Sequence, residues 1–160
     1  YYLLFSGMKV RKANIGDIPL IDKFYIKGAL EEVKLQFPTK FKKYISEFKK
    51  YKRERLSGWK KDLKDKKQFN IILEDEGKII GFASAKILPR KRGRLEFVYI
   101  TKKFRGKGFA KKLTLLRMNW LKKNKIKDIE MSVYVKNKPS IILHEKLGFK
   151  KVSYKMVKEI

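Results

Sequence analysis

Residues 98–110, which read VYITKKFRGKGFA, contain the transition that decides the fold. Residues 98–100 form an apolar strand candidate, the turn that follows contains Gly106 and Gly108, and apolar side chains recur at helical spacing from Phe109 onward. The first turn of a helix has unpaired N–H groups and the positive end of the helix dipole, so it receives an anion well. This order of strand, turn and helix predicts a mixed α/β fold with an anion site at the turn.

The side chains of the turn suit a diphosphate. Glycines let the backbone approach a phosphate closely, and Arg105 and Lys107 add cationic donors. The turn lacks the GxxxxGK[ST] spacing of nucleotide triphosphatases. It also lacks the third glycine of the dinucleotide motif GxGxxG, because Ala110 stands two residues after Gly108. Two glycines before a helix are a weak signal when taken alone.

Periodicity and turn residues divide the rest of the chain into helices followed mainly by strands. We expect two helices before the strands, at 17–27 and at 41–51, the second with an apolar stripe between lysines. We expect another helix near the end of the chain, at 137–147 before Gly148. We expect extended segments at 8–13, 69–73, 78–85, 95–101, 128–135 and, as one or two closing strands, 149–157. The expected architecture is therefore a mixed sheet flanked by helices.

Length and composition predict one domain. The chain has 160 residues, of which 43% are hydrophobic, and a domain usually takes about 100–150 residues. We assign residues 8–160 to this domain and interpret residues 1–7 as a leader or a cloning remnant. The absence of Cys excludes disulfides and thiolate chemistry, and a single His excludes multi-histidine metal centres, so we expect no metal site. No apolar run approaches the roughly 18 residues of a membrane span, and we expect a cytoplasmic protein.

The chain is strongly basic. Its 43 Lys and Arg residues against 16 Asp and Glu residues give a formal net charge of +27. Such a charge attracts nucleic acid, a phosphorylated cofactor or an anionic membrane. The lysines are scattered from Lys9 to Lys158, however, and Lys enrichment also accompanies growth at high temperature. Nucleic acid is a possible partner, and the charge identifies none.

Two ordered motifs resemble the GNAT superfamily of N-acetyltransferases. Arg105-x-x-Gly108-x-Ala110 has the form R/Q-x-x-G-x-G/A of the family's coenzyme A turn. Residues 137–149, NKPSIILHEKLGF, are similar to the family segment N-x-x-A-x-x-x-Y-E-K-L-G-F, with Ser140 for Ala and His144 for Tyr. Together with the opening segment 12–18, the resemblance covers residues 8–160. It implies the GNAT acyl-CoA N-acyltransferase fold, a mixed β-sheet that splays apart between two parallel strands.

The resemblance also implies a cofactor and the residues that bind it. Acetyl-coenzyme A would lie in the gap between the splayed strands, with its pantetheine arm against the main chain of Val98, Tyr99 and Ile100. Its pyrophosphate would be wrapped by the turn residues, which are Arg105, Gly106, Lys107, Gly108, Phe109 and Ala110. Asn137 would reach the cofactor arm, although an Asn at this position is equally typical of a helix N-cap.

The family's direct transfer reaction needs an acid for the leaving thiolate. The family Tyr that commonly supplies this proton corresponds to His144 here, which makes His144 the candidate general acid. An imidazolium has a suitable pKa range for the role. The alternative is that His144 is packed or bonded to the backbone. Tyr134 and Tyr154 are nearby alternatives in sequence without positional support.

The reaction also needs a base, because the attacking amine must be neutral. Glu96 precedes the cofactor strand and is the candidate general base, although a carboxylate at this position is more often a solvent-facing partner, here for Arg94 or for Lys residues. Some relatives carry a Glu where this chain has Ser132, which cannot act as a base. Glu130 shares that strand but lies farther from the motif, and a water relay is a further alternative.

The predicted function is transfer of an acetyl group from acetyl-coenzyme A to a primary amine, carried by a small molecule or by the N-terminus or a lysine of a peptide or protein. The positive field disfavours a polyamine and suits a peptide or a ribosome-associated protein. A rival hypothesis is a non-catalytic GNAT-like module that binds coenzyme A or RNA. A homodimer is possible through an edge strand near the C-terminus.

Overall fold

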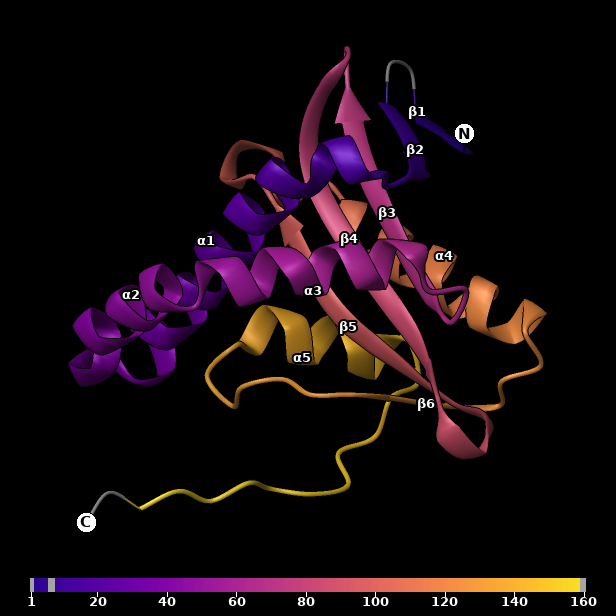
Figure 1. The fold of residues 1–160 in the computed structure, drawn as a ribbon. Helices are drawn as coiled ribbons and strands as arrows, with labels where there is room; N and C mark the ends of the chain where they lie inside the picture. The colour runs from indigo at the N-terminus through magenta and orange to yellow at the C-terminus, as the bar shows by residue number, and fades with distance from the viewer. Residues whose placement is uncertain (1, 6–7, 159–160) are drawn as a thin grey trace.

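The computed structural model describes residues 2–5 and 8–158, and its strands form one sheet in the order β1-β2-β3-β4-β5-β6 (Figure 1). The strands are β1 (Tyr2–Phe5), β2 (Met8–Lys12), β3 (Gln68–Asp75), β4 (Lys78–Leu88), β5 (Arg92–Ile100) and β6 (Asp128–Met131). The α-helices are α1 (Ile18–Gln36), α2 (Phe41–Lys50), α3 (Lys52–Lys64), α4 (Phe109–Lys123) and α5 (Lys138–Lys146). All neighbouring strands are antiparallel except β5 and β6, which are parallel. The mixed sheet flanked by helices is confirmed.

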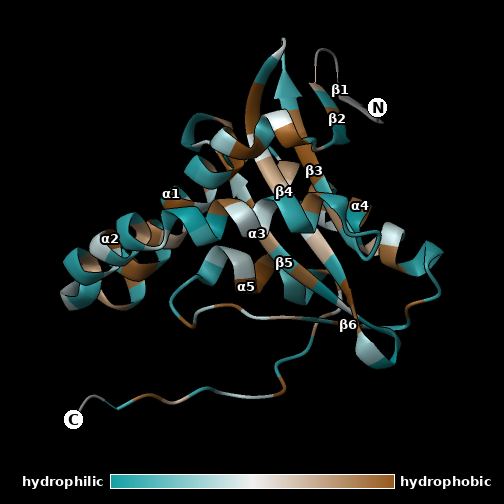
Figure 2. Ribbon diagram, in the orientation of Figure 1, coloured by the Kyte–Doolittle hydropathy of each residue, from teal (hydrophilic) through white to brown (hydrophobic). Residues whose placement is uncertain are grey.

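Helices cover both faces of the sheet (Figure 1). Helix α4 packs on one face, where Leu113 and Leu121 belong to the same buried cluster as Ile71 of β3. Helices α1 and α3 pack on the other face, where Ile21 lies in a cluster with Ile72. Successive strand residues point to opposite faces, so the two neighbouring isoleucines serve two cores. The central strands are accordingly the most continuously hydrophobic part of the ribbon (Figure 2).

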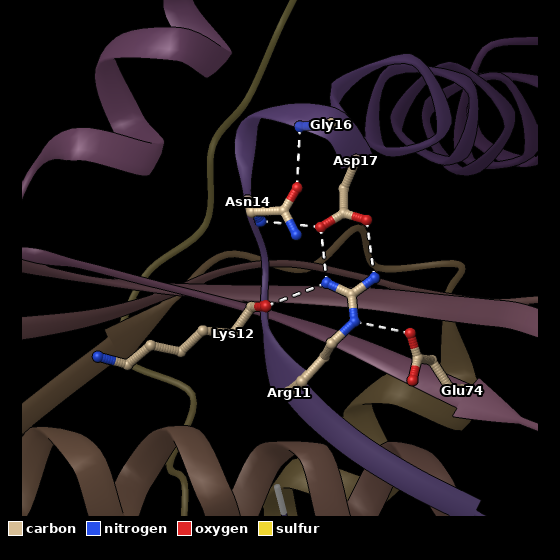
Figure 3. Close-up of polar contacts among 6 residues, drawn as sticks. All are labelled: Arg11, Lys12, Asn14, Gly16, Asp17 and Glu74. Carbon is tan, nitrogen blue, oxygen red and sulfur yellow. Dashed lines mark hydrogen bonds and ion pairs between the residues drawn. The ribbon is translucent and has the colours of Figure 1, made fainter. Parts of the chain in front are cut away.

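The start of α1 is held to the sheet by a buried ion-pair network (Figure 3). The guanidinium of Arg11 on β2 donates to both carboxylate oxygens of Asp17, at 2.7 and 2.8 Å, and to Glu74 of β3 at 2.6 Å. Asp17 also accepts from the main-chain N–H of Asn14, whose own side chain accepts from Gly16. Hydrogen bonds from Arg11 hold the pKa of Asp17 below its ordinary value. The network fixes the point at which the chain leaves the sheet and enters the helix.

Helix α1 is longer than the sequence pattern predicts. We expected it to end before Gly28, but it continues to Gln36. Gly28 is a packing residue: a Cβ atom there would lie 2.8 Å from Cζ of Phe97 and 3.2 Å from Cδ2 of Tyr99, both on β5. The glycine therefore lets the helix approach β5 closely, and the correction places the last two turns of α1 beside the splayed part of the sheet.

The basic stretch after Pro38 forms two helices where the pattern predicts one. The break falls at Tyr51, with φ −96° and ψ 24°, and none of the apolar residues of α2 is fully buried. Helix α3 is tied to α1 by Arg55, whose Nε lies 2.6 Å from Asp22 of α1, and by the indole N–H of Trp59, which donates to the same carboxylate. Figure 1 shows α2 projecting beyond the sheet, so its apolar stripe is only half-covered.

Both ends of the expected domain differ from the sequence prediction. Residues 2–5, within the segment interpreted as a leader, form β1 and pair with β2, whereas residues 1, 6 and 7 lie outside the described part. The predicted strand at 128–135 ends at Met131, and no strand forms within residues 149–158. A strand needs a neighbour to satisfy its backbone groups, and none lies beside these segments in the described part. The edge strand expected to support a homodimer is thus absent there.

Within residues 2–5 and 8–158, every helix is too short or too polar to cross a bilayer.

Candidate functional site

The sheet opens between its two parallel strands. Strands β5 and β6 pair from Arg92 with Asp128 to Leu95 with Met131, and the pairing stops there. β5 continues for five more residues to Ile100, while the chain after Met131 leaves the sheet and reaches α5 through residues 132–137. One edge of residues 96–100 therefore has no strand beside it in the described part of the chain. The predicted splay is confirmed.

A β-bulge lies where the strands separate. Ala83 of β4 pairs with Val98 and Ala85 pairs with Leu95, so β5 carries one extra residue opposite Ser84. The main-chain N–H of Phe97 donates to the Ser84 hydroxyl at 3.2 Å instead of to a strand partner. The bulge turns the following residues of β5 and so sets the direction in which their main-chain groups point into the gap.

The side chain of Arg117 on α4 forms hydrogen bonds to this bulge. Its side chain is 1% exposed, and Nη1 donates to the carbonyl oxygens of Ser84 at 3.1 Å and Phe97 at 3.3 Å. Nη2 donates to the Thr114 hydroxyl at 3.0 Å. Burial lowers the pKa of Arg117 to about 10, so the group stays charged at neutral pH. The sequence analysis missed this residue, because an Arg within a lysine-rich helix carries no signal of burial.

The glycine turn at the N-terminus of α4 has the shape that the sequence predicts. Gly106 has φ +77° and Gly108 has φ +81°, which are left-handed conformations that favour glycine. Both residues are exposed, and a Cβ at either position would find no atom within 4 Å. No side chain caps α4, so its first-turn N–H groups face an open turn. The turn fits a diphosphate that approaches the backbone closely.

The strand residues before the turn bury their side chains, as expected if a ligand in the gap contacts only their main chain. Tyr99 and Ile100 are 6% and 7% exposed, Val98 is half-buried, and Phe109 and Ala110 anchor the start of α4 in the core. Val98 and Ile100 pack with the α4-side core, and Tyr99 packs with α1. Their side chains are committed to packing, so only main-chain groups are available to a ligand in the gap.

Arg105 does not point freely into the turn. Its Nε donates to the carbonyl oxygen of Ile100 at 2.8 Å, and Nη1 lies 2.8 Å from the Glu31 carboxylate of α1. Its guanidinium also lies 5.2 Å from the centre of the Tyr99 ring. Arg105 thus links the turn to α1, whereas the exposed Lys107 lies over the Phe104 ring at 5.4 Å.

Asn137 makes two contacts that the sequence only partly predicts. Its Oδ1 accepts from the main-chain N–H of Ser140 at 3.3 Å, which is the N-cap interaction of α5. Its Nδ2 donates to Oε1 of Glu32 at 3.3 Å. Sequence reasoning missed Glu31 and Glu32 because it ended the first helix before Gly28. Continuing that helix would have placed two adjacent carboxylates beside the predicted cofactor strands.

His144 is buried rather than poised in solvent. It is 5% exposed, its Nδ1 lies 2.7 Å from the Ser140 carbonyl oxygen, and its ring packs edge-on against Phe149 at 5.4 Å. Nδ1 is therefore the donor, and Nε2 is buried without a hydrogen-bond partner in the described part. Burial, with the nearby charge of Arg117, lowers the pKa of His144 despite the bond to Ser140. The general-acid role of His144 stays a prediction, and this environment favours the neutral ring.

The single histidine makes this charge state directly measurable. We expect the imidazole C–H signals of His144 to titrate below pH 6.5, the ordinary midpoint, because burial penalises the charged form. Proton NMR across pH 4–8 gives the midpoint without assignment, and the urea-unfolded chain provides the reference near 6.5. A folded midpoint at or above 6.5 would contradict this account and strengthen the case for an imidazolium acid.

The carboxylate candidates on the strands lie at the surface. Glu96 is the first residue after the paired part of β5, and its carboxylate is 40% exposed at 3.8 Å from Nε of Arg94. Glu130 pairs with Arg92 at 3.1 Å, and the Ser132 hydroxyl accepts from Arg94. Tyr154 is 78% exposed in the segment after α5. Glu96 therefore stands at the base of the splay, and its role as a general base stays a prediction.

Comparison with known proteins agrees with this geometry. Residues 30–149 match the model of the acetyltransferase (GNAT) family. The chain is 33% identical over 96 residues to the SPbeta prophage-derived uncharacterized N-acetyltransferase YokL of Bacillus subtilis, a match that covers 58% of this chain and 54% of that protein. It is 29% identical over 79 residues to the mycothiol acetyltransferase of Thermomonospora curvata, covering 49% and 27% of the two chains. The matches thus span about half of the first relative and about a quarter of the second.

Solved structures share the fold over nearly the whole chain. The PaiA N-acetyltransferase of Thermoplasma acidophilum in complex with coenzyme A has a TM-score of 0.74 at 22% identity over 92% of each chain. The aminoglycoside N-acetyltransferase AAC(6')-Iy in complex with coenzyme A has a TM-score of 0.66 at 18% identity, covering 96% of this chain and 94% of that one. These likenesses show the fold, and the family match covers most of the chain. The protein therefore belongs to the acetyltransferase (GNAT) family.

Proposed function

We propose that this chain is an acetyl-coenzyme A-dependent N-acetyltransferase that transfers the acetyl group directly to a primary amine. The observation that carries the proposal is the gap between β5 and β6, which opens beside the uncapped, glycine-rich start of α4. An exposed glycine turn at a helix start and a strand edge without a neighbouring strand in the described part occur side by side, which suits a diphosphate joined to an amide-containing arm.

Each part of the site has a distinct task in this proposal. The main chain of Val98, Tyr99 and Ile100 pairs with the pantetheine arm along the open edge of β5. The residues of the turn, 105–110, receive the pyrophosphate with main-chain N–H groups, and Lys107 adds positive charge. Arg105 serves the turn indirectly through its bonds to Ile100 and Glu31. The Asn137 side chain is engaged with Ser140 and Glu32, so its contact with the cofactor arm is the weakest of the assignments.

The chemistry that the chain must supply is limited. The acceptor amine has to lose a proton before its nitrogen can attack the thioester carbonyl carbon, and main-chain donors on the open edge of β5, beyond the bulge, stabilise the negative charge that develops on the carbonyl oxygen. The thiolate that leaves then takes a proton from an acid or from water. A buried neutral His144 with its Nδ1–H already donated is a poor acid, which makes solvent the simpler proton source.

The acceptor belongs to the class of primary amines. The net charge of +27 repels a polycation at long range, which supports an acceptor with one ammonium group, such as a peptide N-terminus or a lysine. A cytoplasmic location, binding to nucleic acid and homodimerisation stay predictions.

Release of thiol from acetyl-coenzyme A tests the proposal. The wild-type chain is assayed with spermidine, benzylamine, a peptide with a free N-terminus and a lysine-containing peptide with a blocked N-terminus, each against a no-amine control. Amine-dependent thiol release with formation of the acetylated product supports the enzyme. Tight coenzyme A binding without turnover on any amine, together with a salt-sensitive shift with RNA, would instead support the non-catalytic module.

A further inference from the structure

The last turns of α1 present one face toward both arms of the opened sheet. Gly28, Glu32 and Gln36 follow each other at intervals of four residues, so they share a face of the helix. Gly28 packs against Phe97 and Tyr99 on the β5 side of the gap. Glu32 accepts from Asn137 at 3.3 Å on the β6 side. One face of α1 therefore contacts β5 through Gly28 and the start of α5 through Glu32.

Aromatic rings gather around this carboxylate. The ring of Tyr134, on the segment that leaves β6, packs edge-on against Phe37 at 5.9 Å, directly after α1. Burial raises the pKa of Tyr134, and the charge of Glu32 raises it further, followed by smaller effects of Tyr44 and Tyr25. These rings lie within electrostatic reach of one another and of Glu32. An ammonium group is stabilised both by a carboxylate and by the faces of aromatic rings.

The hydrogen-bonding capacity at this face is not fully used. Glu32 is half-buried and accepts a hydrogen bond from the Asn137 side chain. Oε1 of Gln36, one turn further along α1, is buried and has no hydrogen-bond partner in the described part. Two oxygen acceptors on one helix face, one of them charged, can accept hydrogen bonds from a ligand that donates several. A primary ammonium has three N–H donors.

We propose that Glu32 binds the ammonium group of the acceptor and acts as the general base that deprotonates it, with Tyr134 and Phe37 forming an aromatic wall of the same subsite. This inference rests on the proposed N-acetyltransferase function and assigns its acceptor side. The acceptor is a single primary ammonium attached to an apolar or aromatic group that packs on the wall.

The proton and electron balance of the step is simple. An oxygen of the Glu32 carboxylate takes one proton from the ammonium, and the freed nitrogen lone pair forms the N–C bond with the thioester carbonyl carbon. The C–S bond breaks, and its electron pair leaves on sulfur. The second proton of the nitrogen passes to the thiolate through solvent, and Glu32 returns its proton to water. No oxidant, reductant or metal takes part.

Glu32 is better suited to this step than the other carboxylates near the gap. Glu31 is committed to Arg105 at 2.8 Å, which leaves it less free to bind an ammonium group. Glu96 lies beside Arg94 and is 40% exposed. Burial raises the pKa of Glu32, and the bond from Asn137 offsets this only in part. A base with a raised pKa is a stronger proton acceptor and stays ionised at neutral pH when the shift is moderate.

Asn137 and Tyr134, on the segment after β6, interact with Glu32, and further rings near Tyr134 come from two helices. Tyr25 lies on α1 and Tyr44 on α2, while Glu31 of α1 is paired with Arg105. Lys40, between α1 and α2, lies over the Phe37 ring at 5.4 Å. In this proposal, the ionisation of Glu32 controls the acid side of the reaction.

The test compares Glu32→Gln with Glu31→Gln, its neighbour of the same shape and charge. The pH profile of kcat/KM is measured with the best acceptor of the panel above, and coenzyme A affinity is measured by calorimetry for each variant. The wild type should show an acid limb above the ordinary pKa of Glu. Glu32→Gln should lose that limb and about 100-fold or more in kcat/KM at pH 7, with coenzyme A affinity unchanged. Glu31→Gln should keep the limb.

A second readout does not depend on turnover. Benzylamine should bind the coenzyme A-saturated wild type, benzyl alcohol should not compete with it, and Glu32→Gln should weaken benzylamine at least about tenfold, as expected for loss of a charge-assisted bond. The inference is overturned if Glu32→Gln keeps the acid limb and stays within threefold of the wild-type rate. Absence of turnover on every amine by the wild type contradicts the proposed function instead, so the two failures are distinguishable.

Discussion

Replacement of Gly108 by Glu is expected to weaken coenzyme A binding by about 100-fold or more, with the chain still folded. Gly108 ends the turn at φ +81°, directly before the first residue of α4. A glutamate there places a carboxylate at the helix end that is proposed to receive the pyrophosphate. Like charges at this distance repel, and a loss of 100-fold corresponds to about 2.7 kcal/mol, well within the range of close charge pairs.

The strain of the substitution can be separated from its charge. No atom lies within 4 Å of a Cβ at this position, so a side chain fits, and only the positive φ is unfavourable. Gly108→Ala carries that strain alone, at about 1 kcal/mol of stability, and should bind coenzyme A within about tenfold of the wild type. Gly77→Glu is the matched control. It introduces the same kind of backbone strain, at φ +76°, and the same charge in equally open surroundings, but in the β3–β4 turn. Equal affinity of Gly108→Glu and Gly77→Glu would refute the assignment of the turn.

Replacement of Arg117 by Met is expected to lower the free energy of unfolding by about 3 kcal/mol. The guanidinium is buried and bonds the carbonyl oxygens of Ser84 and Phe97 at the bulge. Methionine fills much of the same volume but donates nothing, so both carbonyls lose a donor, at about 1–3 kcal/mol for each buried acceptor left unpaired. Removal of a buried charge offsets part of that loss.

Urea unfolding of three variants measures this effect. Arg92→Met removes an exposed guanidinium, 3.1 Å from Glu130, and should change stability by no more than about 0.5 kcal/mol. Arg117→Lys keeps the charge but cannot reach both carbonyls and the Thr114 hydroxyl in one plane, so its stability should fall between the wild type and Arg117→Met. If Arg117→Met loses no more than Arg92→Met, the bulge does not depend on the buried cation.

The local features of the site were predictable from the sequence because they depend on backbone conformations that only certain residues allow. Gly106 and Gly108 are needed where φ is positive, and Asn137 caps α5 through its own side chain. The hairpin between β3 and β4 turns at Glu76 and Gly77 for the same reason. Such features are decided within a few residues, so a pattern of residue types is sufficient to find them.

The features that involve contacts over long sequence distances were not predictable in the same way. In the sequence, a glycine such as Gly28 is typical of a helix end. In the folded chain it lies within α1, where Phe97 is so close that a Cβ atom would clash with its ring. Residues 132–135 have a strand pattern, but the divergence from β5 after Leu95 leaves them without a partner. The pairing of Glu32 with Asn137, 105 residues apart, follows from both corrections.

The sequence alone therefore determined the order of the central strands and of α4 and α5, the glycine turn at the start of α4 and the family, because each is expressed in short-range patterns. Only the tertiary structure decided which side chains lie near the gap: Arg117 at the bulge, Arg105 bonded to Glu31, His144 buried, and Glu32 bonded to Asn137. The physical reason is that burial and charge pairing set the protonation and the reach of these groups. Both depend on neighbours that the chain brings together only when it folds.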